Sequence, residues 1–242
     1  MTTPPSPHER ASSGAWMAAG LGSIGLAVLA RAMTSGGAGG AALVWAAVAV
    51  YATVMIAVLW LVIGHHSHGR FGPANHVTVA RVVLTALVAG AAVERPTADL
   101  AWWTIGLTSV ACVLDGVDGW LARRTQLYSP FGARFDMEID ALLTLALSVL
   151  VWRFDKAGGW VLACGLMRYA FLAARWIWPW LAGPLRPTLR GKTVAVVQFV
   201  GLAAALIPSV RPAASRAIAA ATLAALAWSF GLDVRRLWQA RR

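Results

Sequence analysis

Apolar runs long enough to cross a lipid bilayer recur along this chain from residue 15 to residue 234. A transmembrane helix needs about 20 consecutive, mostly apolar residues. Hydrophobic residues make up 59% of the 242 residues and charged residues only 13%, whereas soluble domains average about 45–50% and about 25%. The sequence therefore predicts an all-α, polytopic integral membrane protein that forms a helical bundle.

The apolar runs are separated by short segments, none of which is long enough to bury a core of its own. Residues 1–14 are polar and proline-rich, which is typical of a disordered cytosolic tail. The run that follows lacks a small-residue cleavage site, so we interpret it as a retained helix rather than a signal peptide. A window of about 19 residues finds about eight spans, roughly at 15–33, 42–63, 76–93, 100–122, 135–153, 159–180, 193–208 and 215–233.

The net charge of +11 is explained by membrane topology rather than by nucleic-acid binding, which we do not expect. With the N-terminus in the cytosol, 13 Lys and Arg residues, Arg81 among them, are counted on the cytosolic side and six on the other. The remaining two, Arg168 and Arg175, fall within a span. Because cytosolic loops carry an excess of basic residues, both termini are predicted to be cytosolic.

Four aspartates near the end of the fourth predicted span and the start of the fifth carry the strongest chemical signal. Asp115 and Asp118 are three residues apart and Asp136 and Asp140 four apart, so each pair shares one face of a helix. A turn between the two spans would bring all four carboxylates together at the cytosolic end of a helical hairpin. Carboxylates this close together repel one another, and hard divalent cations bound to their oxygens would neutralise the negative charge. The alternative interpretation is four solvated aspartates that cap two helices.

The residues around these aspartates suit a phosphate-containing ligand. Gly119, Ala122 and Gly132 are small and would let a ligand approach the backbone closely. Arg123 follows Asp118 by five residues and could pair with a phosphate. Two metal ions held beside them could stabilise the attacking and leaving oxygens of a phosphoryl displacement.

The segments DGVDGWLAR and GARFDMEID, eight residues apart, resemble the signature of the CDP-alcohol phosphotransferase (phosphatidyltransferase) family. Each fixed position of that signature is present: two aspartates three apart, Gly, Ala and Arg, then Gly and two aspartates four apart. The resemblance implies an integral membrane enzyme with a six-helix core, which maps to residues 70–242. Residues 15–69 would then form an extra N-terminal transmembrane hairpin.

The resemblance also implies roles for individual residues. Asp115 and Asp136 would be shared by two divalent metals, Mg²⁺ or Mn²⁺, with Asp118 completing one and Asp140 the other. Asp140 would also be the catalytic base that deprotonates the acceptor alcohol. The cytidine diphosphate moiety would be bound by Gly119, Ala122, Arg123, Gly132 and, as weaker candidates, Ser129, Asn75 and Thr78.

The expected reaction transfers a phosphatidyl or other substituted phosphate group from a CDP-alcohol to a small alcohol, and releases CMP. CDP-diacylglycerol is the expected donor, and a homodimer in the cytoplasmic membrane, with its site facing the cytosol, is the expected setting. Arg168, Arg190 and Lys192 are candidates for binding the acceptor. A divalent-cation transporter that uses the same carboxylates, or an inactive scaffold, are the alternatives. Transporter ion sites usually lie on broken helices near the midplane, whereas these aspartates lie at the end of a span.

Overall fold

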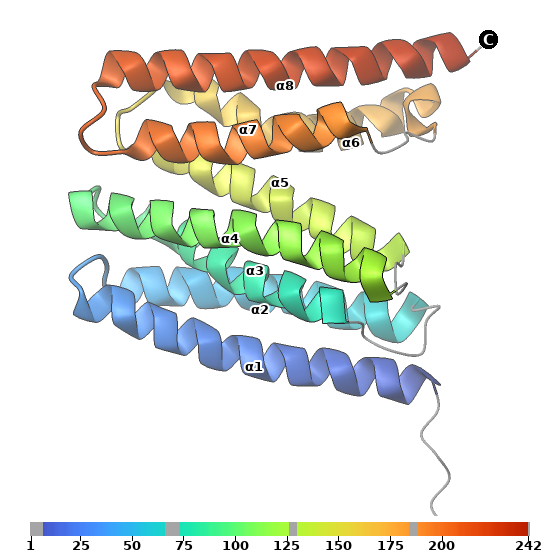
Figure 1. Cartoon of the computed structure of the whole chain (residues 1–242), viewed down its shortest axis with the longest axis horizontal. Helices are drawn as coiled ribbons and strands as arrows, with labels where there is room; N and C mark the ends of the chain where they lie inside the picture. The colour runs from blue at the N-terminus through green and yellow to red at the C-terminus, as the bar shows by residue number, and fades with distance from the viewer. Residues whose placement is uncertain (1–6, 66–72, 126–129, 184–187, 242) are drawn as a thin grey trace, which may run out of the picture. The chain divides into compact units, whose positions relative to one another are not determined.

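The described part of the chain is mainly α-helical, as a computed structural model shows (Figure 1). The structure describes residues 7–65, 73–125, 130–183 and 188–241, and no strand occurs within these ranges. The prediction of an all-α bundle is confirmed. The helices are α1 (Pro7–Ser35), α2 (Ala41–His65), α3 (Pro73–Gly90), α4 (Ala98–Thr125), α5 (Pro130–Arg153), α6 (Ala163–Ile177), α7 (Leu189–Leu206) and α8 (Pro212–Ala240), with 3-10 turns at Ala91–Val93, Gly159–Leu162 and Pro179–Ala182.

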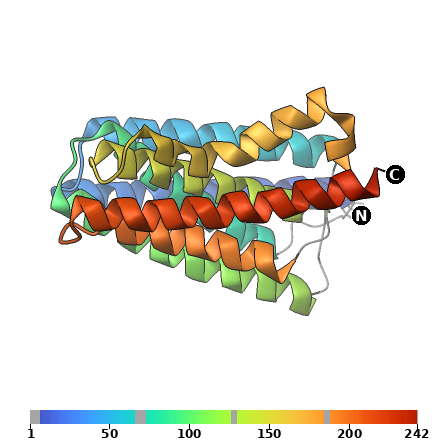
Figure 2. The same cartoon turned by 90° about the horizontal axis from the view of Figure 1, so that it is seen from above.

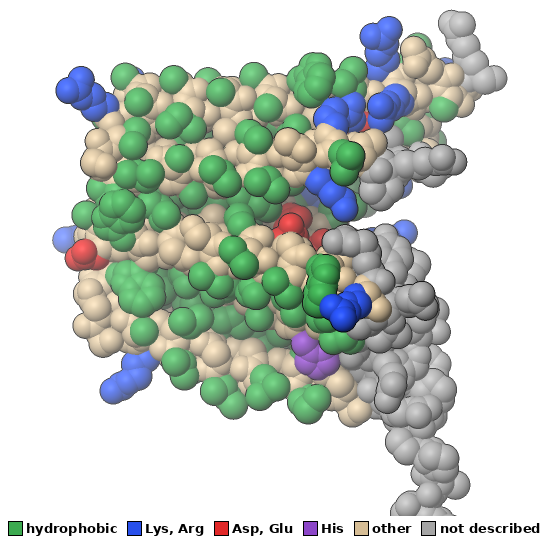
Figure 3. All heavy atoms as spheres, in the orientation of Figure 1, with side chains coloured by type: hydrophobic (Ala, Val, Ile, Leu, Met, Phe, Trp, Pro, Cys, Tyr) green, Lys and Arg blue, Asp and Glu red, His purple; other side chains and the backbone are tan. Residues whose placement is uncertain are grey.

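Seven of the helices in the described ranges are long and apolar enough to cross a membrane. The remaining predicted span, 135–153, lies within α5, whose first half carries three acidic residues, Asp136, Glu138 and Asp140. Figure 3 shows hydrophobic side chains along the helices of each unit, as expected for surfaces that face lipid. α1 begins at Pro7 and so includes part of the segment that the sequence assigned to the N-terminal tail.

The chain divides into two compact units, Met1–Ile139 and Asp140–Arg242. In the first unit, α3 packs against α1, α2 and α4 and is the most deeply buried helix. The turn between α1 and α2 passes through Gly37, whose positive φ of 74° favours glycine. Glu94, just after α3, accepts hydrogen bonds from the backbone N–H groups of Gly40 (2.9 Å) and Leu43 (3.0 Å). This carboxylate caps the N-terminus of α2, where the helix dipole favours negative charge.

In the second unit, α7 and α8 lie side by side in both views (Figures 1 and 2). The buried Lys156 secures the turn between them. Its Nζ donates to the backbone carbonyls of Ile207 (2.9 Å), Pro208 (3.3 Å) and Val210 (2.7 Å). The ammonium group therefore satisfies carbonyls beyond the C-terminus of α7, the end that helix dipoles make favourable for cations.

The approach of α6 to α5 depends on the absence of a side chain at Gly165. A Cβ built on Gly165 would lie 2.4 Å from the Cα of Leu145, closer than two carbon atoms can pack. Gly106 in α4 is the opposite case, because a Cβ there would have no heavy atom within 4 Å.

Replacing these two glycines with alanine should therefore change stability in opposite directions. Gly165→Ala forces α5 and α6 apart, and overpacking of this kind costs about 1–3 kcal/mol. Gly106→Ala adds a better helix former in open space and should raise stability by about 0.5–1 kcal/mol. Thermal unfolding of both variants in the same detergent at one scan rate checks this. Equal melting temperatures for the two variants would contradict the packing between α5 and α6.

Candidate metal centre

Three of the motif aspartates come together in the first unit. Asp115 and Asp118 lie one turn apart near the end of α4, and Asp136 lies in the second turn of α5. Each contributes one carboxylate oxygen to a group in which all oxygens lie within 4.8 Å of one another. The prediction that the two segments bring their carboxylates together thus holds for these three residues.

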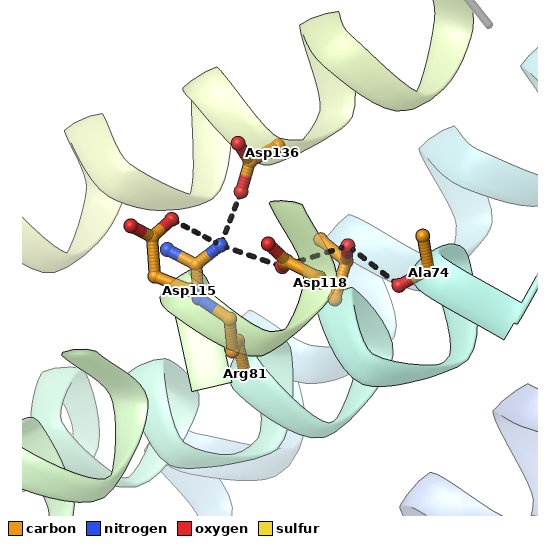
Figure 4. A network of polar contacts seen from close by, with 6 residues as sticks. Ala74, Arg81, Asp115, Asp118 and Asp136 are labelled. Atoms are coloured by element: carbon orange, nitrogen blue, oxygen red, sulfur yellow. Dashed lines mark hydrogen bonds and ion pairs between the residues drawn. The ribbon is translucent and has the colours of Figure 1, made fainter. Parts of the chain in front are cut away.

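A guanidinium group lies at the centre of the three carboxylates (Figure 4). Nη1 of Arg81, on α3, lies 3.0 Å from Asp115 Oδ1 and 3.0 Å from Asp118 Oδ2. The same nitrogen donates a hydrogen bond to Oδ1 of Asp136. A single cationic nitrogen therefore holds carboxylates from two helices together.

Three polar residues of α3 form a row that ends at this cluster, and we call this row the polar stripe. Asn75, Thr78 and Arg81 follow one another at intervals of three residues, so they share a face of the helix, and all three are buried. The hydroxyl of Thr78 donates to the backbone carbonyl of Ala74 (3.1 Å) and lies 3.4 Å from Asp118 Oδ2. The stripe thus brings polar groups of α3 against the acidic end of α4.

Burial within the cluster is uneven. The Arg81 side chain is 1% exposed and that of Asp118 is 6% exposed, whereas Asp115 and Asp136 are 32% and 36% exposed. The cluster therefore has a buried base formed by Arg81 and Asp118 and an accessible edge formed by the other two carboxylates. Three carboxylates around one guanidinium leave an excess of negative charge, which attracts further cations.

The donor set fits a hard divalent cation. Mg²⁺ and Mn²⁺ prefer oxygen ligands, and carboxylates of Asp are the usual protein donors for them. Convergent oxygens from Asp115, Asp118 and Asp136 provide such donors, and the accessible edge gives an ion a path to them.

Asp140 lies one turn beyond Asp136 on α5 and is half-buried. It is not one of the three residues in the described group of convergent oxygens. Because residues four apart share a helix face, Asp136 and Asp140 project from the same side of α5. The roles of Asp140 as a metal ligand and as a general base remain predictions.

The other predicted nucleotide-site residues fall on the same helices. Gly119 on α4 and Gly132 on α5 are half-buried. Ala122 and Arg123 belong to α4, but their side chains lie outside the described part of the structure, as does Ser129 entirely.

The three predicted acceptor residues lie in the second unit. Arg168 is half-buried on α6 and Lys192 is exposed on α7. Arg190, near the start of α7, forms an ion pair with Asp233 of α8, and its guanidinium carbon lies 5.9 Å from the ring centroid of Trp228. Trp228 and Asp233 thus hold Arg190 in place.

Sequence reasoning missed Arg81, which was counted only among the basic residues of the cytosolic side. The structure places it inside α3, and without it the count becomes 12 against six, so the predicted orientation is unchanged. Two signals could have identified it: an arginine inside an apolar run is costly and often functional, and Arg81 continues the three-residue spacing of Asn75 and Thr78.

Comparison with known proteins agrees with this geometry. No curated protein and no solved structure matches the chain. The family model described as CDP-alcohol phosphatidyltransferase matches residues 71–232, from just before α3 to within α8. Members of this family are transferases of substituted phosphate groups and are generally metal-dependent. With two thirds of its length matched and its signature aspartates gathered at one site, the chain belongs to the CDP-alcohol phosphatidyltransferase family.

Proposed function

We propose that this protein transfers the phosphatidyl group of CDP-diacylglycerol to a small alcohol and releases CMP, using two divalent cations. The observation that carries the proposal is the convergence of Asp115, Asp118 and Asp136, which occupy signature positions of the family. A chain whose helices are apolar enough to cross a membrane also suits a donor with a lipid tail.

The metal ions would be held by Asp115, Asp118, Asp136 and Asp140, and Mg²⁺ and Mn²⁺ are the candidates. Bound there, they would offset the charge of the pyrophosphate and stabilise the attacking and leaving oxygens. The carboxylates of Asp115 and Asp136 are accessible enough to receive them.

The residues of the chain then orient the substrates and move one proton. Gly119 and Gly132 leave room for the cytidine diphosphate moiety, and Arg123 pairs with its phosphate. Asp140 takes the proton from the acceptor hydroxyl as the new phosphorus–oxygen bond forms and the bond to CMP breaks. Thr78 and Asn75, buried on α3, support the nucleotide side of the site.

Arg190 is the acceptor candidate with the most defined surroundings. Its ion pair with Asp233 fixes one side of the guanidinium, while its Nε is buried with no hydrogen-bond partner among the described residues. This supports a role in binding an anionic acceptor, together with Lys192 and Arg168. The experiment that identifies the acceptor is incubation of the purified protein with labelled CDP-diacylglycerol, Mn²⁺ and a panel of phosphorylated and unphosphorylated alcohols.

The site is proposed to face the cytosol from the cytoplasmic membrane, and the protein to act as a homodimer. The excess of basic residues on one side of the spans supports the orientation. The dimer rests on the family resemblance alone, and cross-linking in native membranes tests it.

Metal dependence is tested by Asp115→Asn. This change removes a ligand proposed to be shared by both metals, so CMP release should fall below detection. Glu138→Gln is the matched control, because Glu138 is exposed on another face of α5. This variant should keep the activity of the unaltered protein. Undiminished turnover of the unaltered protein in excess chelator would refute the metal mechanism.

The role of Asp140 is tested by separating binding from turnover in Asp140→Asn. Loss of a general base should reduce turnover about 10²–10⁴-fold, whereas the affinity for the CDP donor should be largely kept because Asp115, Asp118 and Asp136 remain. Donor binding and CMP release are measured on the same preparation. If both are lost together, Asp140 acts chiefly as a metal ligand, and if turnover survives, another group accepts the proton.

Orientation is tested with a single accessible cysteine. Cys112 and Cys164, which are half-buried and buried, are replaced with alanine, and Ser129→Cys is introduced between α4 and α5. A membrane-impermeant thiol reagent should label this cysteine only after sealed cells are opened. Labelling of intact cells would place the site on the opposite side of the membrane.

A further inference from the structure

Arg81 contacts the three carboxylates that would hold a metal ion. Its Nη1 contacts oxygens of Asp115, Asp118 and Asp136, and the three residues with which it makes these contacts are the three that form the convergent group. Divalent cations bind carboxylate oxygens at about 2.0–2.6 Å. An ion bound to the same three oxygens would therefore lie too close to Nη1 for both cations to remain in place.

The negative charges of the three carboxylates require a nearby cation even when no metal is bound. Three carboxylates this close together destabilise the fold unless positive charge compensates them, most of all Asp118, whose side chain is 6% exposed. Arginine suits this role because its guanidinium stays protonated and its planar fork of donors can bond several oxygens. Arg81 approaches from the buried base of the cluster, whereas Asp115 and Asp136 form the accessible edge.

We propose that Arg81 is a stand-in counterion that holds the carboxylates of the metal-free protein together and withdraws when a divalent cation binds. The inference rests on the proposed function, since it assumes that these aspartates are metal ligands. Metal binding at this site is then an exchange of one cation for another. The arrangement keeps the ligands assembled without a metal and weakens metal affinity, because the ion must compete with the guanidinium.

If Arg81 competes with the metal ion, its removal should strengthen metal binding. If Arg81 helps to position the metal ligands, its removal should weaken metal binding. If Arg81 competes, only the small fraction of molecules with the guanidinium withdrawn can bind metal, and the apparent affinity is reduced by that fraction. If Arg81 instead orients the ligands around a bound metal, its loss should weaken metal binding about 10–100-fold, as for other groups that position ligands.

The experiment measures Mn²⁺ binding to the purified full-length protein in detergent, without donor, by electron paramagnetic resonance. Arg81→Met keeps much of the side-chain volume and removes the charge. For a withdrawn state populated at about 10% or less, the dissociation constant for Mn²⁺ should fall about tenfold or more. An unchanged or higher dissociation constant would overturn the inference.

A thermal melt of the same samples provides a second readout. After treatment with chelator, Arg81→Met should melt below the unaltered protein, and Mn²⁺ should raise its melting temperature by more than it raises that of the unaltered protein. Lys156→Met is the matched control, because it also removes a buried cation with three oxygen partners but belongs to the second unit. It should lower the melting temperature equally with and without Mn²⁺ and leave Mn²⁺ affinity unchanged.

The unaltered protein alone can decide the question if Arg81→Met does not fold. A structure determined with Mn²⁺ should show the guanidinium withdrawn from at least two of the three carboxylates. Retention of all three contacts beside bound Mn²⁺ would refute the inference while leaving the proposed function intact. Absence of Mn²⁺ binding in both the unaltered protein and Arg81→Met would refute the metal site and the inference together.

Discussion

Repulsion among carboxylates at the end of an apolar bundle is the constraint on which the site depends. Asp115, Asp118 and Asp136 each place a carboxylate oxygen within 4.8 Å of the others. The helix that carries the first two is apolar enough to cross a membrane. Removing one partner from a buried ion pair typically costs about 3–5 kcal/mol. The guanidinium of Arg81 therefore links the end of α4 to the start of α5 through the carboxylates of Asp115, Asp118 and Asp136.

The burial of α3 affects this interaction. This helix is the most deeply buried of the first unit, and its neighbours α1, α2 and α4 cover it on several sides. Burial removes Arg81 from water and strengthens its attraction to the carboxylates, because the local dielectric is low. The N-terminal hairpin formed by α1 and α2 packs against the helix that carries Arg81, although it lies outside the region that the family model matches.

The sequence predicted the helices well and the polar contacts only in part. Hydropathy located seven of the eight predicted spans, because apolar length is a property of the local sequence, but it did not predict where each helix ends. α4 continues to Thr125 and α5 begins at Pro130, since helical hydrogen bonding does not stop where the apolar residues stop. The pairing of Asp115, Asp118 and Asp136 could be predicted from helical spacing and the family signature. Their contact with Arg81 could not, because it joins residues 34 to 55 positions apart on helices whose packing no periodicity specifies.

The continuity of α5 sets the spacing between Asp136 and Asp140. This helix runs unbroken from Pro130 to Arg153, and the boundary between the two compact units falls after Ile139, between Asp136 and Asp140. With a rise of about 1.5 Å per residue, the α-carbons of these two aspartates lie about 6 Å apart along the helix axis. The proposed ligand and the proposed base therefore lie on consecutive turns of one helix, and the helical rise sets the spacing of their backbones.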